Sequence, residues 1–200
     1  MVSPPRFRIP HAFSHSAMSN ERLRPWTIRS STYRLDEPFL RVRSDTVELP
    51  DGRLIEGYFV RESRGFAIVA ALTPERHVVL VRQYKHGIGE IVLELPAGMI
   101  DAGETPAGCA VRELAEETGY AGDPPILLRS LFADPTGSNA SFHVFLIENA
   151  TPKFAQSLDP TEAIEIETTT IDGLRAAVRD GRIASGSQVA AAYIALDHIR

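Results

Sequence analysis

One stretch of the sequence constrains the fold more than any other, residues 98 to 120, which read GMIDAGETPAGCAVRELAEETGY. Thr105 is a suitable N-cap, and Pro106 suits the first position of a helix. Gly119 can adopt the left-handed conformation that often ends a helix. The stretch therefore predicts a helix from about Pro106 to Thr118, preceded by a glycine-containing loop.

The two faces of this predicted helix differ in character. At roughly 100° per residue, one face is apolar and suited to pack on a sheet, and it consists of Ala107, Ala110, Val111 and Leu114. The opposite face carries Glu113, Glu116 and Glu117. A solvated surface is the ordinary explanation for acids on a helix. However, like charges one turn apart repel, and the helix dipole disfavours anions in the last turn. A divalent cation would remove both penalties, so the acids indicate a metal site.

The loop before the helix supports a metal site. A strand is expected to end at Leu95 and Pro96, and the backbone freedom of Gly98 would turn the Ala97 carbonyl toward the helix as a further oxygen ligand. Glu104, eight residues before Arg112, can pair with its guanidinium and fix the loop against the helix, which is a structural role.

The rest of the chain divides into three parts. Residues 1–24 are rich in Pro, Ser and Arg, show no periodicity and are expected to form a disordered tail, within which Met18 is an alternative start. Residues 25–62 alternate β-branched or aromatic with polar residues and form a β-rich extension. Residues 63–200 combine strands, two of them apolar enough to be buried on both faces, with the helix above and two C-terminal helices. The expected fold class is α/β (α+β), with a mixed sheet flanked by helices.

Composition narrows the possible functions. The net charge of −5 provides no basic face for nucleic acid, and no apolar run is long enough to span a membrane. The start of the chain lacks the apolar core of a secretory signal, and Cys109, the single cysteine, excludes an internal disulfide framework. These features favour a cytoplasmic protein that acts on a small molecule.

The spacing of Gly98, Glu104 and the run Arg112–Tyr120 resembles the signature box of the Nudix hydrolases, with an aromatic residue at Tyr120 where an aliphatic one is usual. The flanking segments LVRQYKHG, ADPTGSN and TEAIEI are similar to those of the ADP-ribose/ADP-sugar diphosphatase branch, and this similarity extends from about Trp26 to Ile199. The resemblance implies a Nudix-type α/β/α sandwich with a small β-rich N-terminal extension.

The resemblance also implies site residues. The magnesium ligands would be the Ala97 carbonyl, Glu113 and Glu117, with Glu116 assisting in binding and catalysis, and manganese is the alternative ion. Gly98, Glu104, Arg112 and Gly119 would be the structural positions of the box. The base that activates water would be Glu162, although the residues alone leave Glu165 and Glu167 open.

Substrate contacts come from the same resemblance. Trp26 and Tyr58 would stack on the adenine in a homodimer that exchanges its N-terminal extensions. Arg61, Arg82 and Lys85 would meet the diphosphate or the terminal ribose. Lys85 stands where the family more often has arginine, and lysine lacks the bidentate fork.

The implied reaction is magnesium-dependent hydrolysis of the diphosphate bond of ADP-ribose or a related nucleoside diphosphate sugar, which gives AMP and a sugar phosphate. One alternative is the same chemistry on GDP-mannose or another nucleoside diphosphate derivative. A second is a non-catalytic module that senses nucleotide sugars. Isomerase chemistry on an isoprenoid diphosphate is disfavoured, because Cys109 lies inside the predicted helix.

Overall fold

The computed structural model describes residues 23–38 and 40–199, which divide into two compact units at residues 61 and 62. The predicted tail, residues 1–24, lies outside the described residues except for its last two. Among the described residues, no helix has the length and apolar character that a membrane crossing requires.

Unit 1 contains a three-stranded sheet in the order β1-β2-β3, formed by β1 (Thr27–Glu37), β2 (Leu40–Glu48) and β3 (Leu54–Glu62), with β1 and β2 antiparallel. A turn at residues 50–52 joins β2 to β3, and in it the Gly52 amide donates to the Leu49 carbonyl at 2.9 Å. Val47 is buried, whereas many other large apolar side chains of this unit are exposed. The sheet therefore has little apolar core of its own.

Unit 2 is built on a seven-stranded sheet whose central order is β12-β5-β4-β10-β9. Its strands are β4 (Phe66–Leu72), β5 (His77–Lys85), β6 (Glu90–Glu94), β7 (Ala97–Met99), β9 (Ile126–Phe132), β10 (Ser141–Ile147) and β12 (Ile164–Thr170). β10 runs parallel to β4, and the other neighbouring strands of this sheet pair antiparallel, so the sheet is mixed. A separate small ladder joins β8 (Tyr120–Ala121) to β11 (Thr151–Pro152).

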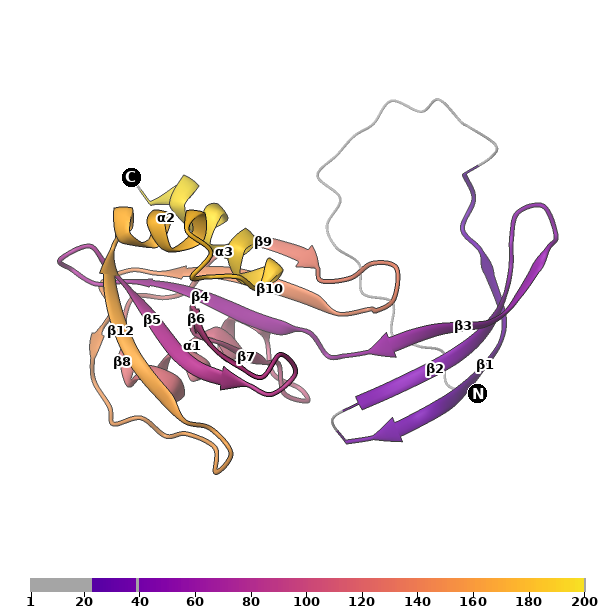
Figure 1. Cartoon of the computed structure of the whole chain (residues 1–200), viewed down its shortest axis with the longest axis horizontal. Helices are drawn as coiled ribbons and strands as arrows, with labels where there is room; N and C mark the ends of the chain where they lie inside the picture. The colour runs from indigo at the N-terminus through magenta and orange to yellow at the C-terminus, as the bar shows by residue number, and fades with distance from the viewer. Residues whose placement is uncertain (1–22, 39, 200) are drawn as a thin grey trace. The chain divides into compact units, whose positions relative to one another are not determined.

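Helices cover both faces of this sheet (Figure 1). The side chains of β4 alternate between the two sides, because successive residues of a strand point in opposite directions. Ala67, Val69 and Ala71 belong to the apolar cluster that includes α1 (Pro106–Thr118). Ile68, Ala70 and Leu72 belong to the cluster that includes α2 (Ile171–Arg179) and α3 (Gly186–His198). The predicted α/β/α sandwich with a mixed sheet is confirmed.

The sheet opens between its two central strands. β4 and β5 pair through Ala71–Val79 and Leu72–Val78, after which β7 takes the place beside β4 and β6 the place beside β5. The chain between β6 and β7 is held by the buried amide of Gln188 in α3, which accepts from the Leu95 amide at 3.0 Å and donates to its carbonyl at 3.1 Å. The opening places β7 directly before the loop that enters α1.

Helix α1 has the predicted ends. The Thr105 hydroxyl accepts from the Gly108 amide at 3.0 Å, and Gly119 has a φ of 71°. The predicted apolar face was wrong at Val111, which is 44% exposed, while Cys109 is fully buried. Burial raises the pKa of the Cys109 thiol to about 12, so this residue is a packed apolar group rather than a reactive thiol.

Candidate active site

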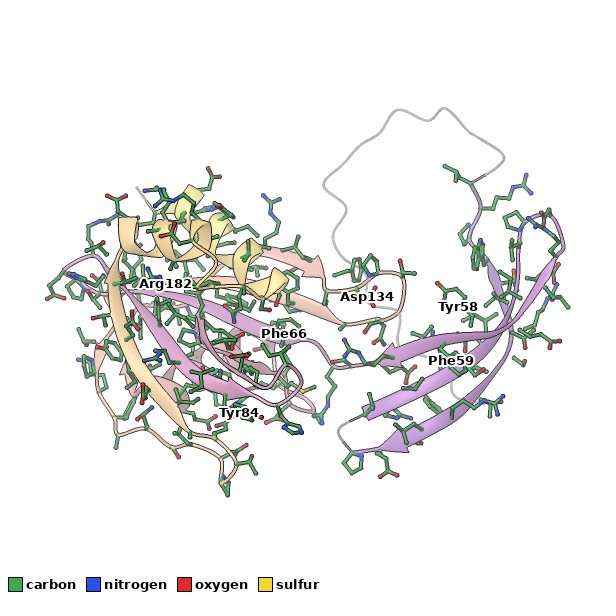
Figure 2. The ribbon with its side chains drawn as sticks, viewed as in Figure 1. Tyr58, Phe59, Phe66, Tyr84, Asp134 and Arg182 are labelled. Carbon is green, nitrogen blue, oxygen red and sulfur yellow. The ribbon has the colours of Figure 1, made fainter. Side chains whose placement is uncertain are left out.

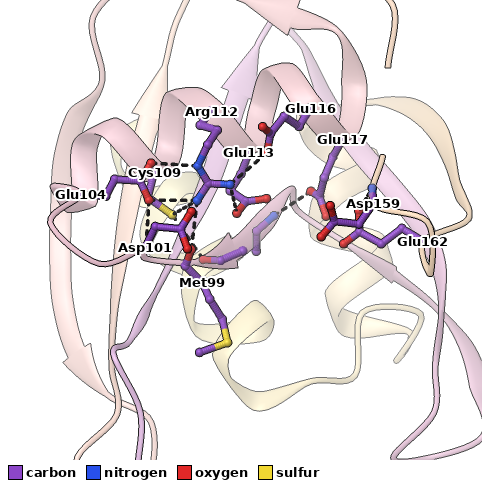
Figure 3. Close-up of polar contacts among 12 residues, drawn as sticks. Met99, Asp101, Glu104, Cys109, Arg112, Glu113, Glu116, Glu117, Asp159 and Glu162 are labelled. Atoms are coloured by element: carbon purple, nitrogen blue, oxygen red, sulfur yellow. Dashed lines mark hydrogen bonds and ion pairs between the residues drawn. The ribbon is translucent and has the colours of Figure 1, made fainter. Parts of the chain in front are cut away.

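The site forms where β7 passes beneath the last two turns of α1 (Figure 3). Gly98 lies in β7 and has no positive φ, so the expectation that it supplies unusual backbone freedom was wrong. Glycine is needed here because there is no room for a side chain: a Cβ at this position would lie 2.0 Å from the Glu113 carboxyl group. The absence of a side chain on Gly98 lets the Glu113 carboxylate rest directly against the strand.

Arg112 ties the entry loop to the helix. Its Nε and Nη2 donate to the two carboxylate oxygens of Glu104 at 2.8 and 2.9 Å, which confirms the predicted ion pair in bidentate form. Nη2 also donates to the Met99 carbonyl at 3.0 Å. On its other side, Nη1 donates to Glu113 at 2.6 Å and to Glu116 at 2.9 Å. One guanidinium therefore fixes both the loop and two of the box carboxylates.

Hydrogen bonding to Arg112 strongly affects the Glu104 carboxyl group. It lowers the Glu104 pKa from 4.5 to about 2, so this carboxylate stays ionised through the neutral range. Hydrogen bonds to Glu104, Glu116 and Glu113 in turn raise the pKa of Arg112, which therefore stays positively charged. Glu104 and Arg112 thus act as a permanent structural pair at the edge of the acidic cluster.

Glu117 differs from the other acids of the helix because it is almost completely buried. Its side chain was predicted to lie on the polar face, yet the residue is 3% exposed, and its Oε2 accepts from the Ala97 amide at 2.9 Å. Burial is the main cause that raises the Glu117 pKa to about 8, and the neighbouring charges of Glu113 and Glu162 raise it further. Burial also raises the pKa of Glu113. These two carboxylates repel each other at the site.

Among the three downstream acids, the structure brings Glu162 to the cluster. Its charge affects the pKa of both Glu113 and Glu117, and Figure 3 shows its side chain beside Glu117. Glu165 lies on β12, where its carboxylate and Arg82 Nη1 are 3.4 Å apart. Glu167 pairs with Leu80 of β5 further along the same strand.

The predicted substrate-binding residues lie in both units. In unit 2, Arg82 meets Glu165, and Lys85 Nζ lies 3.2 Å from Oε2 of the buried Glu94. In unit 1, Trp26 and Tyr58 contact each other edge to face, with ring centroids 5.8 Å apart and an interplanar angle of 83°. Arg61 is an exposed residue of β3. Arg61 and Arg82 are thus exposed on their strands, Lys85 is half-buried at the end of β5, and the two rings form a contact pair.

Sequence reasoning missed two glutamines that organise the site. Gln188 holds the backbone at Leu95, and the Gln156 amide joins the end of α1 to the start of β12. Neither residue has a recognisable spacing to the box, because both contacts join segments far apart in the chain. His143 of β10 has a hydrogen-bonding partner in the neighbouring strand, with Ser130 Oγ 2.8 Å from its Nδ1.

Divalent cations suit the donors gathered here. The donors are carboxylate oxygens, Gly98 leaves room for one of them, and Glu117 brings a buried carboxylate that accepts from the Ala97 amide. In the part of the chain that the structure describes, no three Asp, Glu, His or Cys side chains already stand in metal-binding geometry, and Arg112 Nη1 lies between Glu113 and Glu116. Binding an ion would require these two carboxylates to exchange Nη1 for the cation.

Comparisons with known proteins match the two units separately. The model of the NUDIX domain matches residues 62–186, and that of the nucleoside diphosphate sugar hydrolase N-terminal domain matches residues 26–60. The methanol dehydrogenase activator of Bacillus methanolicus is 31% identical over 76% of this chain and 82% of its own length. The ADP-ribose pyrophosphatase of Bacillus subtilis is 31% identical over 64% of this chain and 69% of its own.

A solved structure described as an ADP compounds hydrolase superposes with a TM-score of 0.76, covering 88% of this chain and 95% of that one at 19% identity. At this identity, the similarity establishes the fold.

The E104Q variant tests the ion pair through the pH dependence of stability. Because the Glu104 pKa falls from 4.5 to about 2 on folding, its contribution is complete above about pH 4.5 and is lost as the pH falls toward 2. E104Q should be about 2 kcal/mol less stable at neutral pH. Urea unfolding from pH 2 to 7 should show the wild-type advantage disappearing in that window, and a pH-independent difference would contradict the assignment.

The G98A variant tests the close approach of Glu113. The added Cβ would displace a flexible carboxylate rather than backbone, so thermal unfolding should change little. Calorimetry should show Mg²⁺ binding weakened by about 10-fold or more. G186A is the matched control, since a Cβ at Gly186 meets nothing within 4 Å, and it should bind Mg²⁺ like the wild type. Equal affinity in G98A would rule out Glu113 as a ligand.

Proposed function

The chain belongs to the Nudix hydrolase family, and on that premise we propose that it hydrolyses the diphosphate bond of ADP-ribose or a related nucleoside diphosphate sugar. The products would be AMP, when the base is adenine, and a sugar phosphate. The observation that carries the proposal is the gathering of Glu113, Glu117 and Glu162, from α1 and a distant loop, into one mutually repelling cluster. The N-terminal family match and the B. subtilis relative support the substrate class.

Nudix hydrolases generally use a divalent metal, and the ion proposed here is Mg²⁺, with Mn²⁺ as the alternative. The residues that would hold it are the Ala97 carbonyl, Glu113, Glu116 and Glu117. When bound, the ion would neutralise charge on the diphosphate oxygens and lower the pKa of the attacking water. Release of Nη1 from Glu113 and Glu116 would leave Arg112 bound to Glu104, so the loop would stay in place.

The chain's own residues would do the rest. Glu162 orients the water and accepts its proton as the oxygen adds to phosphorus, and the bond from that phosphorus to the bridging oxygen breaks. Arg82 and Lys85 would exchange their carboxylate partners for substrate oxygens. Lys85 is already close enough to Glu117 for its charge to affect the Glu117 pKa. A cation at this point would offset charge on the diphosphate.

The E117Q variant tests the reaction. Glutamine keeps an oxygen for the Ala97 amide, so E117Q should fold. At pH 9 in EDTA, above the Glu117 pKa of about 8, it should melt at or above the wild-type temperature, since a buried charge is removed. Turnover of ADP-ribose with Mg²⁺ should fall by about three orders of magnitude or more. Unchanged turnover would remove Glu117 from the metal site.

The same assay, run with ADP-ribose, other ADP-sugars, GDP-mannose and an oxidised nucleotide, separates the candidate substrates by kcat/KM. GDP-mannose as the preferred substrate would leave the chemistry intact and change the base assignment. Absence of hydrolysis of any of them, with retained binding, would favour the sensor module instead.

We propose further that residues 25–62 form a dimerisation and base-stacking extension of the hydrolase domain, residues 63–200, with a second copy of the chain as the partner. A three-stranded sheet with little buried apolar area is only marginally stable alone. Trp26, Leu54 and Phe59 are 44%, 58% and 57% exposed, and Tyr58 and Phe59 both extend from β3 (Figure 2). Burial of such side chains against a second copy would stabilise the sheet, and the Trp26–Tyr58 pair would offer a ring to the base.

Light scattering after size exclusion tests the dimer. The wild type should elute with twice the chain mass of 22.0 kDa, and F59E should shift it toward the monomer, because a charge would be buried at the interface. E56Q, a polar change on the same strand, is the control and should remain dimeric. A monomeric wild type would refute the dimer without bearing on the chemistry.

A further inference from the structure

The segment after β11 closes the C-terminal end of α1. The last carbonyls of a helix have no partner within it, and here a single stretch of chain supplies several. The amides of Lys153 and Phe154 donate to the Gly119 carbonyl at 2.8 and 3.0 Å, and the Ser157 amide donates to the Glu116 carbonyl at 2.9 Å. The stretch therefore runs along the helix end that carries the acidic cluster.

One side chain in this stretch makes a different connection. Gln156 Nε2 donates to the Glu117 carbonyl at 2.7 Å and to the Ile164 carbonyl at 3.2 Å. Glu117 is the buried acid of α1, and Ile164 is the first residue of β12. A single amide group with two hydrogens thus joins the helix of the proposed metal ligands to the strand that follows Glu162.

The loop enclosed by these contacts carries Glu162. It is anchored at one end by Ser157 on α1 and at the other by Ile164, and within it the Glu162 amide donates to the Asp159 carbonyl at 2.9 Å. The Asp159 amide donates a hydrogen bond to the Glu162 carboxylate at 3.2 Å. Figure 3 places Asp159 and Glu162 beside Glu117. The bonds between Asp159 and Glu162 form a turn inside the loop, whereas the contacts at its two ends, Ser157 and Ile164, fix its distance from α1.

We propose that Gln156 is a positioning residue for the reaction, whose side-chain amide sets the separation between the Glu117 turn of α1 and the loop that carries Glu162. The inference rests on the proposed function, in which Glu162 takes the proton from the attacking water. Gln156 does not touch the substrate. It acts through Glu162, since misplacement of a base by about 1 Å can cost about 100-fold in rate.

A double-mutant cycle of Q156L and E162Q tests this inference with Mg²⁺ and ADP-ribose. E162Q should lower kcat by about 10²- to 10⁴-fold. Q156L, which keeps the shape but loses both donors, should lower kcat by about 10- to 100-fold, with KM and the Mg²⁺ half-saturation within about 2-fold of the wild type. In the E162Q background, Q156L should cost less than about 2-fold, because the base it positions is gone.

Two further variants serve as a control and as a substitute for Q156L. S157A removes the neighbouring hydroxyl, which makes no side-chain hydrogen bond within the described residues, and it should retain wild-type kcat. Q156N keeps the amide but is too short to span both carbonyls, so its loss should fall between those of the wild type and Q156L. It takes the place of Q156L if that variant fails to fold.

Equal losses from Q156L in both backgrounds, or a loss expressed as raised KM or weakened Mg²⁺ dependence, would overturn the inference and leave Gln156 a structural clamp. A normal kcat in Q156L would also overturn it. Normal turnover in E162Q would instead refute the proposed base, so the two failures are distinguishable.

Discussion

The ion pair between Arg112 and Glu104 is the contact on which the site depends. Each partner alone would be a poorly solvated charge, and together they form a bidentate pair that joins the entry loop to α1. The same guanidinium reaches Glu113 and Glu116, so one fixed cation organises an acidic cluster that would otherwise repel itself. Because only Nη1 contacts those two acids, the proposed metal ion could replace it there while Nε and Nη2 stay on Glu104 and hold the loop.

The acids of α1 stand at positions that oppose the stability of the helix. Acids in the last turn of a helix oppose its dipole, and burial of Glu117 adds a desolvation cost that raises its pKa. The fold offsets part of this cost because Gln156 and the Ser157 amide donate hydrogen bonds to the backbone carbonyls of this turn. A hydrogen-bonded backbone around these acids is the support that the proposed metal ligands would need.

The opening between β4 and β5 explains how a sandwich fold accommodates the site. Two strands that paired along their full length would leave no place for β7 beneath α1. Gln188 of α3, on the far face, binds the backbone at Leu95 and so supports the strand that supplies Ala97 and Gly98. Both helical layers thus contribute to the opening between the central strands.

The sequence by itself determined the local features. Caps and periodicity gave the bounds of α1, the continuous apolar runs gave the buried strands, and the spacing of Glu104 and Arg112 gave their pair, because each depends on residues close in the chain. Only the tertiary structure decided that Glu117 and Cys109 are buried while Val111 is exposed. It also showed that Gly98 is needed because a side chain there would collide with Glu113. The fold alone also showed that Glu162, and not Glu165 or Glu167, lies beside Glu117, and it revealed the contacts of Gln156 and Gln188. These depend on which distant segments pack together, and a helical or strand period carries no information about that.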